Sequence, residues 1–386
     1  MLPPSRRSTA SLFYPRPLPR TPLVGIALPS VRPRPCGSMI SGALPEGCRL
    51  CEEGAKMVLF VTGLCSYHCF YCPVSDEKMY KDVMFADEMR VERDEDVLAE
   101  ARAIRAKGAG ITGGDPMEAM DRLCHYLRLL KAEFGPEFQT HLYTMTTDLD
   151  KIRRARAAGL DEIRFHVPPG LWRHAATSGF VPAVREARDL GMSVGLEVPL
   201  LPDRKSDLIE LLRWAESEQL EFVNLDELEY SEANWGRMRR SDYSMKHELS
   251  YGVKGADEAA AEILRMPWRI TVHYCSSGYK DGWQLRTRIK RRAETVARAY
   301  DEVTEDGTLV KGIIEADDLA AVERELRGTF QVPPELLAAV PERNRVEVAP
   351  WVLEEIAAKL PWPSFVVEEY PTADALEVER QRLPGY

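Results

Sequence analysis

The sequence predicts an α/β fold: a partial (β/α) barrel of about six to seven parallel strands, followed by a small C-terminal α+β domain. Three observations predict it. Apolar, often β-branched runs recur along the chain, a helical stretch follows most of them, and this alternation is lost after residue 300. Strands that alternate with helices form parallel sheets, because each helix carries the chain back to the start of the next strand.

The predicted strands are short, and the helices between them are longer. Strands are expected at 57–63, 109–112, 138–145, 162–168, 192–200, 220–230 and 269–275. Helices are expected at 94–107, 117–133, 148–158, 180–190, 205–218 and 255–266. The glycines of "RAKGAG", "RAAGLDEI" and "ARDLGMSV" are typical of helix C-termini. In barrels the chemistry lies at the C-terminal ends of the strands, so the residues that follow each strand are the candidate site.

The 386 residues divide into four expected segments. Residues 1–38 contain six arginines, nine prolines and no acid, so they are expected to be disordered. They are interpreted either as an organelle transit peptide, although the prolines oppose an amphipathic helix, or as a mis-assigned start with Met39 as the first residue. A cysteine-containing segment is expected at 39–55, the barrel at 56–300 and the small α+β domain at 301–386.

Two regions have less regular patterns. Residues 231–254 have no clean periodicity and are interpreted as an insertion or lid. In the C-terminal domain, helices are expected at 317–327, 334–339 and 350–359, among short strands.

The formal net charge is −10, and it becomes −16 when residues 1–38 are left out. This acidic balance predicts no general attraction to nucleic acid. The arginine-rich helix expected at 284–300 is the one candidate basic surface. No apolar run approaches the roughly 20 residues that a membrane-spanning helix needs. The clustering of the eight cysteines favours metal binding over disulfides, so we expect a reducing, cytoplasmic location.

Three cysteines follow the first predicted strand closely. Cys65, Cys69 and Cys72 have the spacing CxxxCxxC. Thiolates in a tight loop select iron–sulfur clusters or zinc. A structural zinc site needs a fourth ligand from elsewhere in the chain, whereas a cubane cluster held by three thiolates keeps one iron open for a substrate or cosubstrate.

The motif CxxxCxΦC, in which Tyr71 is the aromatic residue Φ, resembles that of the radical S-adenosylmethionine (radical SAM) superfamily. The strand–helix pattern of residues 56–275 is also similar to that family. The context "FVTGLCxxxCxYCP" most resembles the subgroup related to the pyruvate formate-lyase activating enzyme. The resemblance implies a barrel of radical SAM type. It also implies that Cys65, Cys69 and Cys72 hold a [4Fe–4S] cluster and that Tyr71 lies near the adenine of S-adenosylmethionine (SAM).

The same resemblance implies a reaction. One electron, from a donor of the flavodoxin or ferredoxin type, cleaves SAM to methionine and a 5′-deoxyadenosyl radical. The radical then abstracts hydrogen from a substrate that the sequence does not identify.

A second motif, "ITGGDP", ends the second predicted strand. The family has a Gly-Gly-Glu-like motif here that binds the amino group of SAM, so the resemblance assigns this role to Gly113, Gly114 and Asp115. Asp115 stands where Glu is commoner, and it keeps the negative charge.

Later strands offer weaker candidates for SAM contacts. By resemblance, Arg164 and Glu197 are the first of these, and the alternative is that they are barrel-lining groups satisfied by other protein groups. Further candidates are His166, Asn224 and Glu227.

The upstream "PEGCRLCEEGAK" places Cys48 and Cys51 in a CxxC half-site for zinc or an auxiliary cluster. Cys275, at the end of the last barrel strand, is the candidate for completing this second metal site, with His273 on the same strand face. The alternatives are a redox pair or buried thiols.

The sequence therefore predicts a radical SAM enzyme. The alternative is a non-catalytic iron–sulfur or zinc-binding protein, or an electron carrier. Among enzymes, glycyl-radical activation of a partner protein and small-molecule or RNA modification stay open. A small-molecule or protein substrate is favoured over RNA, and no membrane partner is expected.

Overall fold

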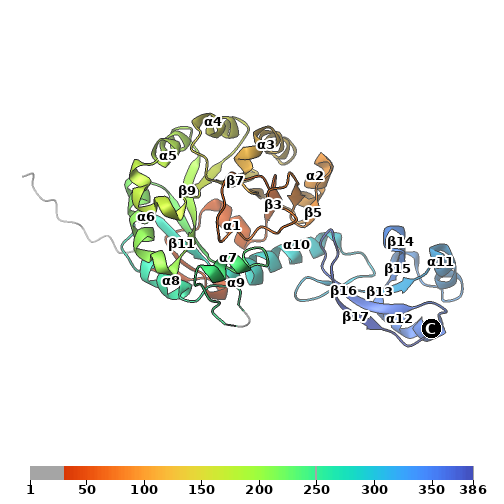
Figure 1. The fold of residues 1–386 in the computed structure, drawn as a ribbon. Coiled ribbons are helices and arrows are strands. Elements are labelled where there is room, and N and C mark those ends of the chain that lie inside the picture. Colours follow the sequence, from red (N-terminus) through yellow and green to blue (C-terminus); the bar gives the residue numbers. More distant parts are fainter. Residues whose placement is uncertain (1–29, 248–249, 386) are drawn as a thin grey trace, which may run out of the picture.

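The computed structural model describes residues 30–247 and 250–385. The chain forms two sheets, which lie in separate parts of the molecule (Figure 1). The larger sheet contains seven parallel strands that neighbour one another in chain order, so each strand–helix unit adds its strand beside the previous one. At each edge of this sheet, further short strands pair antiparallel with the outermost parallel strand, and the sheet does not close on itself. The predicted partial (β/α) barrel is confirmed.

All seven predicted strands are present. They are β3 (Lys56–Phe60), β6 (Gly108–Thr112), β7 (Gln139–Thr144), β8 (Glu162–Phe165), β9 (Ser193–Leu200), β10 (Phe222–Glu227) and β11 (Thr271–Cys275). The helices around them are α2 (Asp94–Ala103), α3 (Met120–Phe134), α4 (Leu149–Ala157), α5 (Phe180–Asp189), α6 (Lys205–Ser217) and α8 (Ala256–Leu264). Figure 1 shows these helices on the outside of the ring of strands.

The strands alternate between an apolar outer face and a polar inner face. In β8, for example, Ile163 and Phe165 belong to the core between strands and helices, while Glu162 and Arg164 form an ion pair in the barrel interior. Successive side chains of a strand point to opposite faces of the sheet. The apolar side chains of one strand therefore pack in the core, while its polar side chains point into the barrel interior. The result is a barrel whose interior carries the ionisable groups.

Helix α1 (Glu46–Glu52) lies inside the ring of strands (Figure 1). A Cβ on its Gly47 would lie 2.6 Å from both Arg164 Nη2 and His141 Nδ1, so the helix packs directly on the polar interior. Glycine at this position allows that close approach. Because Glu162, the first residue of β8, is also within reach of Gly47, α1 covers the end of the barrel where the strands begin.

The end of the predicted disordered tail is corrected by the structure. Residues 1–29 lie outside the described residues, but β1 (Arg32–Pro33) pairs with β2 (Met39–Ser41), and β2 pairs with β11. Ser38 is fully buried, and its hydroxyl lies 3.2 Å from His273 Nε2. Strand β11 and His273 lie more than two hundred positions along the chain, so the composition of the segment could not reveal these contacts.

Two of the three predicted glycine helix ends are confirmed. Gly159 and Gly191 have φ values of +114° and +75°, in the region that favours glycine. The prediction for "RAKGAG" is wrong, because Arg105 takes the left-handed conformation at φ +50° after α2, and Gly108 begins β6.

The C-terminal part, after α10 (Arg286–Val296), forms a mostly antiparallel sheet with two helices, α11 (Leu319–Gly328) and α12 (Pro350–Ile356). Its strands are β12 (Glu302–Val303), β13 (Leu309–Glu315), β14 (Leu337–Val340), β15 (Arg345–Val348), β16 (Ser364–Glu369) and β17 (Glu377–Arg382). The helix predicted at 334–339 is wrong: a single 3-10 turn, Pro334–Leu336, leads into β14. Pairing of β14 with β15 decides the conformation there.

Candidate functional site

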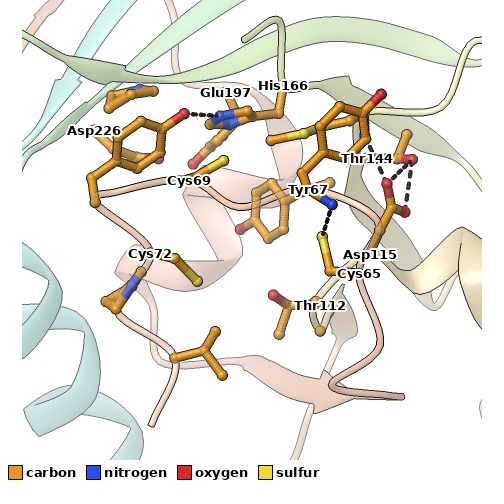
Figure 2. A pocket seen from close by; sticks show the side chains of 18 of the residues that line it. Cys65, Tyr67, Cys69, Cys72, Thr112, Asp115, Thr144, His166, Glu197 and Asp226 are labelled. Carbon is orange, nitrogen blue, oxygen red and sulfur yellow. Dashed lines mark hydrogen bonds between the residues drawn. The ribbon is translucent and has the colours of Figure 1, made fainter. Parts of the chain in front are cut away.

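The cysteine loop follows β3 and opens into a cavity. Cys65, Cys69 and Cys72 are partly exposed, make no disulfide, and all line this cavity of about 610 Å³. Figure 2 shows the three side chains around the same opening, with Asp115 nearby. The cavity continues into the barrel as far as Cys51 of α1 and Lys56 at the start of β3.

Glycines let the cysteine loop and the end of β6 pack backbone against backbone. A Cβ on Gly113 would lie 2.3 Å from the Thr62 carbonyl oxygen, and one on Gly114 would lie 2.3 Å from that of Leu64. Both distances are far below ordinary contact. The amides of Gly114 and Asp115 donate to the carbonyls of Thr62 and Leu64 at 2.8 and 2.9 Å, which fixes the approach to Cys65.

This arrangement fits the iron–sulfur cluster that the motif implies. Three free thiols on one loop face one cavity. In the part of the chain that the structure describes, no three His, Cys, Asp or Glu side chains are grouped to hold a single metal ion. A cluster differs from a single ion in this respect, because each thiolate binds its own iron.

Asp115 is placed beside the cavity, but protein groups already occupy its carboxylate. Its oxygens accept hydrogen bonds from the Thr144 hydroxyl at 2.9 and 3.0 Å, from the Met145 amide at 2.9 Å and from the Met117 amide at 3.0 Å. The side chain therefore caps the turn after β6 and ties it to the end of β7 (Figure 2). The pKa of Asp115 is raised by burial, which these hydrogen bonds oppose.

Tyr71 and His166 form one wall of the cavity. The Tyr71 hydroxyl and His166 Nε2 are 2.8 Å apart. Burial lowers the pKa of His166 to about 4, so the imidazole is neutral at neutral pH and has one N–H and one acceptor nitrogen. The same burial raises the pKa of the Tyr71 phenol. The pair is thus an uncharged hydrogen-bonding surface beside the cysteines.

Arg164 and Glu197 are brought together, but only Glu197 lines the cavity. The Arg164 guanidinium pairs with Glu162 at 2.5 Å and with Glu197 at 3.0 Å, and its side chain is 2% exposed. These ion pairs favour the alternative interpretation of Arg164, a barrel-lining group satisfied by other protein groups. Asn224 is also buried, and its amide donates to Glu197 at 2.8 Å.

Asp226 is a cavity residue that the sequence reasoning missed. It lies two residues beyond Asn224 on β10, so strand alternation could have found it. Burial, reinforced by the charge of Glu197, raises the pKa of Asp226 to about 8. Lys280, also in the cavity wall, lies 3.8 Å from Asp226 and 3.5 Å from Glu229. Glu227 forms an ion pair with Lys246 and accepts a hydrogen bond from the Ser277 hydroxyl.

Among the described residues, the cysteines of the candidate second metal site form no group that could hold a single metal ion. Cys48 is buried, and its sulfur accepts from Arg164 at 3.4 Å and from Asn224 at 3.2 Å. Burial raises the pKa of Cys48 to about 12, which holds it as a thiol. Cys51 instead lines the main cavity. Cys275 is buried, and its sulfur lies 4.0 Å from Gln284 Nε2. These three contribute to no metal group among the described residues.

Helix α7 (Trp235–Arg240), within the predicted insertion, holds the cysteine loop from outside. Arg237 donates from Nε to the Phe70 carbonyl and from Nη2 to the Cys72 carbonyl, both at 3.1 Å. Asn234 donates to the Tyr71 carbonyl at 3.0 Å. Sequence patterns gave no signal for these contacts, since they join segments about 165 residues apart.

The arginines of the basic helix α10 make contacts within the molecule. Arg288 pairs with Asp87 and Glu88, and Arg292 pairs with Glu100 at 3.0 Å. Arg286 pairs with Asp306, and Arg291 donates to backbone carbonyls. Among the described helices, none has the length and apolar character to cross a membrane.

Comparisons with known proteins agree with this site. Residues 59–215 match the family model described as the radical SAM superfamily, and residues 307–383 match one described as a domain of unknown function. Over 360 residues the chain is 33% identical to a protein of Methanocaldococcus jannaschii with the provisional name glycyl-radical enzyme activating enzyme. That match covers 87% of this chain and 92% of the relative.

Solved structures with some similarity include two enzymes. Methylornithine synthase is 14% identical, with a TM-score of 0.39 over 56% of this chain and 65% of its own. Escherichia coli coproporphyrinogen III oxidase, described as a radical SAM enzyme, is 11% identical, with a TM-score of 0.35 over 57% and 54% of the two chains. Neither likeness is strong enough to transfer a function.

Proposed function

Because the chain belongs to the radical SAM superfamily, and is therefore an enzyme, we propose that Cys65, Cys69 and Cys72 hold a [4Fe–4S] cluster and that the adjoining cavity binds SAM. When bound and reduced, the cluster supplies the electron that cleaves SAM to methionine and a 5′-deoxyadenosyl radical, which abstracts hydrogen from a substrate. The single observation that carries the proposal is the set of three free thiols on one cavity. A closed structural site would use four ligands.

The residues around the loop have distinct parts in this proposal. Gly113 and Gly114 hold the cysteine loop against β6, and Asp115 fixes the turn that follows them. Tyr71 and His166 offer a neutral hydrogen-bonding wall for the nucleoside of SAM. Because Asp115 is fully occupied by protein donors, we assign it a positioning role for the ammonium site rather than the whole of that site.

SAM cleavage in vitro tests the proposal. The protein is loaded with iron and sulfide without oxygen, reduced with dithionite and mixed with SAM, and 5′-deoxyadenosine and methionine are measured. Equal yields of both products from the wild type, and none from Cys69→Ala, are expected. A wild-type protein that takes up iron but makes neither product would favour the alternative, an iron–sulfur carrier or zinc-binding protein without catalysis.

For the substrate we propose two classes, a partner protein or a small charged molecule. The name of the M. jannaschii relative supports a glycine of a partner protein, while a cavity that reaches ionisable groups inside the barrel supports a small charged molecule. Extract of the source cells, divided by size into macromolecules and small molecules, distinguishes them. The fraction that raises the rate of 5′-deoxyadenosine formation contains the substrate, and treatment of the large fraction with ribonuclease or protease separates RNA from protein.

The proposal also includes the compartment. The described cysteines are all free, and iron–sulfur clusters of this kind are damaged by oxygen, so we place the enzyme in a reducing cytoplasm.

A further inference from the structure

Helix α7 carries positive charge on an acidic protein. It contains Arg237, Arg239 and Arg240 and no acid, whereas the whole chain has a net charge of −10. Arg239 and Arg240 are exposed, and neither makes an ion pair with any residue in 30–247 or 250–385. The flanking Glu232 and Asp242 lie outside the helix, so the segment keeps a positive excess. Three arginines of α10, Arg286, Arg288 and Arg292, show the opposite pattern, because each pairs with an acidic residue.

This helix is in direct contact with the cysteine loop. Its Arg237 and the neighbouring Asn234 donate to the three consecutive carbonyls of residues 70–72, which end at the third cysteine. Phe70 also stacks on Tyr243, with ring centroids 5.8 Å apart and an interplanar angle of 4°. A protein bound to the outer face of α7 would therefore be separated from Cys72 by little more than the helix itself.

Exposed aromatic side chains accompany the arginines. Trp235 on α7 is 42% exposed, and Tyr80, beside the cysteine loop, is 44% exposed. The Tyr80 hydroxyl donates to the Tyr67 carbonyl at 3.2 Å, which places this side chain at the cysteine loop. Trp, Tyr and Arg are the residues most enriched in the centres of protein interfaces.

We propose that the outer face of α7, with Trp235, Arg239 and Arg240, is the docking site of an acidic one-electron carrier protein of the flavodoxin or ferredoxin type. The inference rests on the proposed function, which requires one electron for each SAM that is cleaved. The docked carrier loses that electron and the cluster on the cysteine loop gains it, and no atom crosses the interface. Charge complementarity selects the partner: an acidic carrier is repelled by most of this acidic surface and attracted where arginines stand unpaired.

The test compares two reductants on one set of variants. Wild type, Arg239→Glu/Arg240→Glu, Arg240→Glu and the matched control Arg128→Glu are loaded with cluster. Arg128 is exposed and makes no ion pair with the residues that the structure describes, and its helix α3 lies across the ring from α7 in Figure 1. Bleaching of the cluster absorbance is followed in an anaerobic stopped-flow instrument after mixing with a reduced bacterial flavodoxin or with dithionite, at low and high salt.

With flavodoxin at low salt, the double variant is expected to be reduced at least about tenfold more slowly than wild type, and Arg240→Glu severalfold more slowly. The Arg128→Glu rate should match wild type. Salt should slow the wild type and have little effect on the double variant. Dithionite, a small reductant that needs no docking surface, should reduce all four proteins alike.

Two results would overturn the docking site. One is a double variant that flavodoxin reduces as fast as wild type. The other is a double variant that dithionite also fails to reduce, since α7 would then act on the cluster itself. A wild-type protein that dithionite reduces without cleaving SAM would instead contradict the proposed function, so the two failures are distinguishable.

Discussion

Gly114→Ala isolates the contact between the cysteine loop and the end of β6. The new methyl group would lie 2.3 Å from the Leu64 carbonyl oxygen and 2.6 Å from that of Gly63. Since such contacts rarely fall below about 3 Å, the two backbones must separate by more than about half an ångström. Gly114 does not have a positive φ, so alanine meets a purely steric obstacle.

The magnitude follows from the rigidity of the two segments. Overpacking against main chain costs about 1–3 kcal/mol, which for a barrel of this size lowers Tm by about 2–12 °C. Leu64 immediately precedes Cys65, so the displacement also moves the first cysteine away from the other two. We expect the variant to fold, to melt lower and to take up less than half of the wild-type iron.

The assay combines thermal unfolding, followed by circular dichroism, with iron content after anaerobic loading. Gly170→Ala is the matched control, because its Cβ would meet no atom within 4 Å. If Gly114→Ala and Gly170→Ala both melt and bind iron like the wild type, the glycine contact does not position the cysteine loop and the reasoning is refuted.

Other predictions follow from the same structure. Cys69→Ser should lose most of the iron while Cys124→Ala, which alters a buried cysteine of α3, keeps it; equal iron in both would contradict the assignment of the loop. Cys51→Ala should leave iron and zinc contents unchanged, and a loss of either metal would restore the second metal site. Asp226→Asn should raise Tm over the wild type by at least about 2 °C at pH 8 and much less at pH 5. Its folded pKa of about 8 lies above the ordinary value of about 4, so Asp226 favours the folded state only while protonated, and that contribution is lost as the pH rises toward 8. A Tm difference that does not change with pH would count against a raised pKa.

The barrel could be predicted from the sequence because each strand carries its own local signal. The apolar outer face of β8, with Ile163 and Phe165, is visible as a β-branched and aromatic run, and the cysteine spacing is visible within one loop. Propensity failed at residues 334–339, where pairing with another strand overrides helical preference.

The sequence was enough to predict several residues of the candidate site, but not their hydrogen-bond partners. Asp115 was found from its motif, yet the hydrogen bonds that it accepts from Thr144 and Met145 come from the end of the next strand, and they support the positioning role that we propose for it. Asn234 and Arg237 could not be found at all, because side chain to carbonyl hydrogen bonds leave no periodicity in the sequence.

Helix α1 gives the cavity a floor, because it covers the end of the barrel where the strands begin and its Cys51 lines the cavity. The cavity therefore extends beyond the cysteine loop, as far as Cys51 and Lys56. A charged molecule held by the ionisable groups of the barrel interior would thus share one continuous space with the proposed cluster.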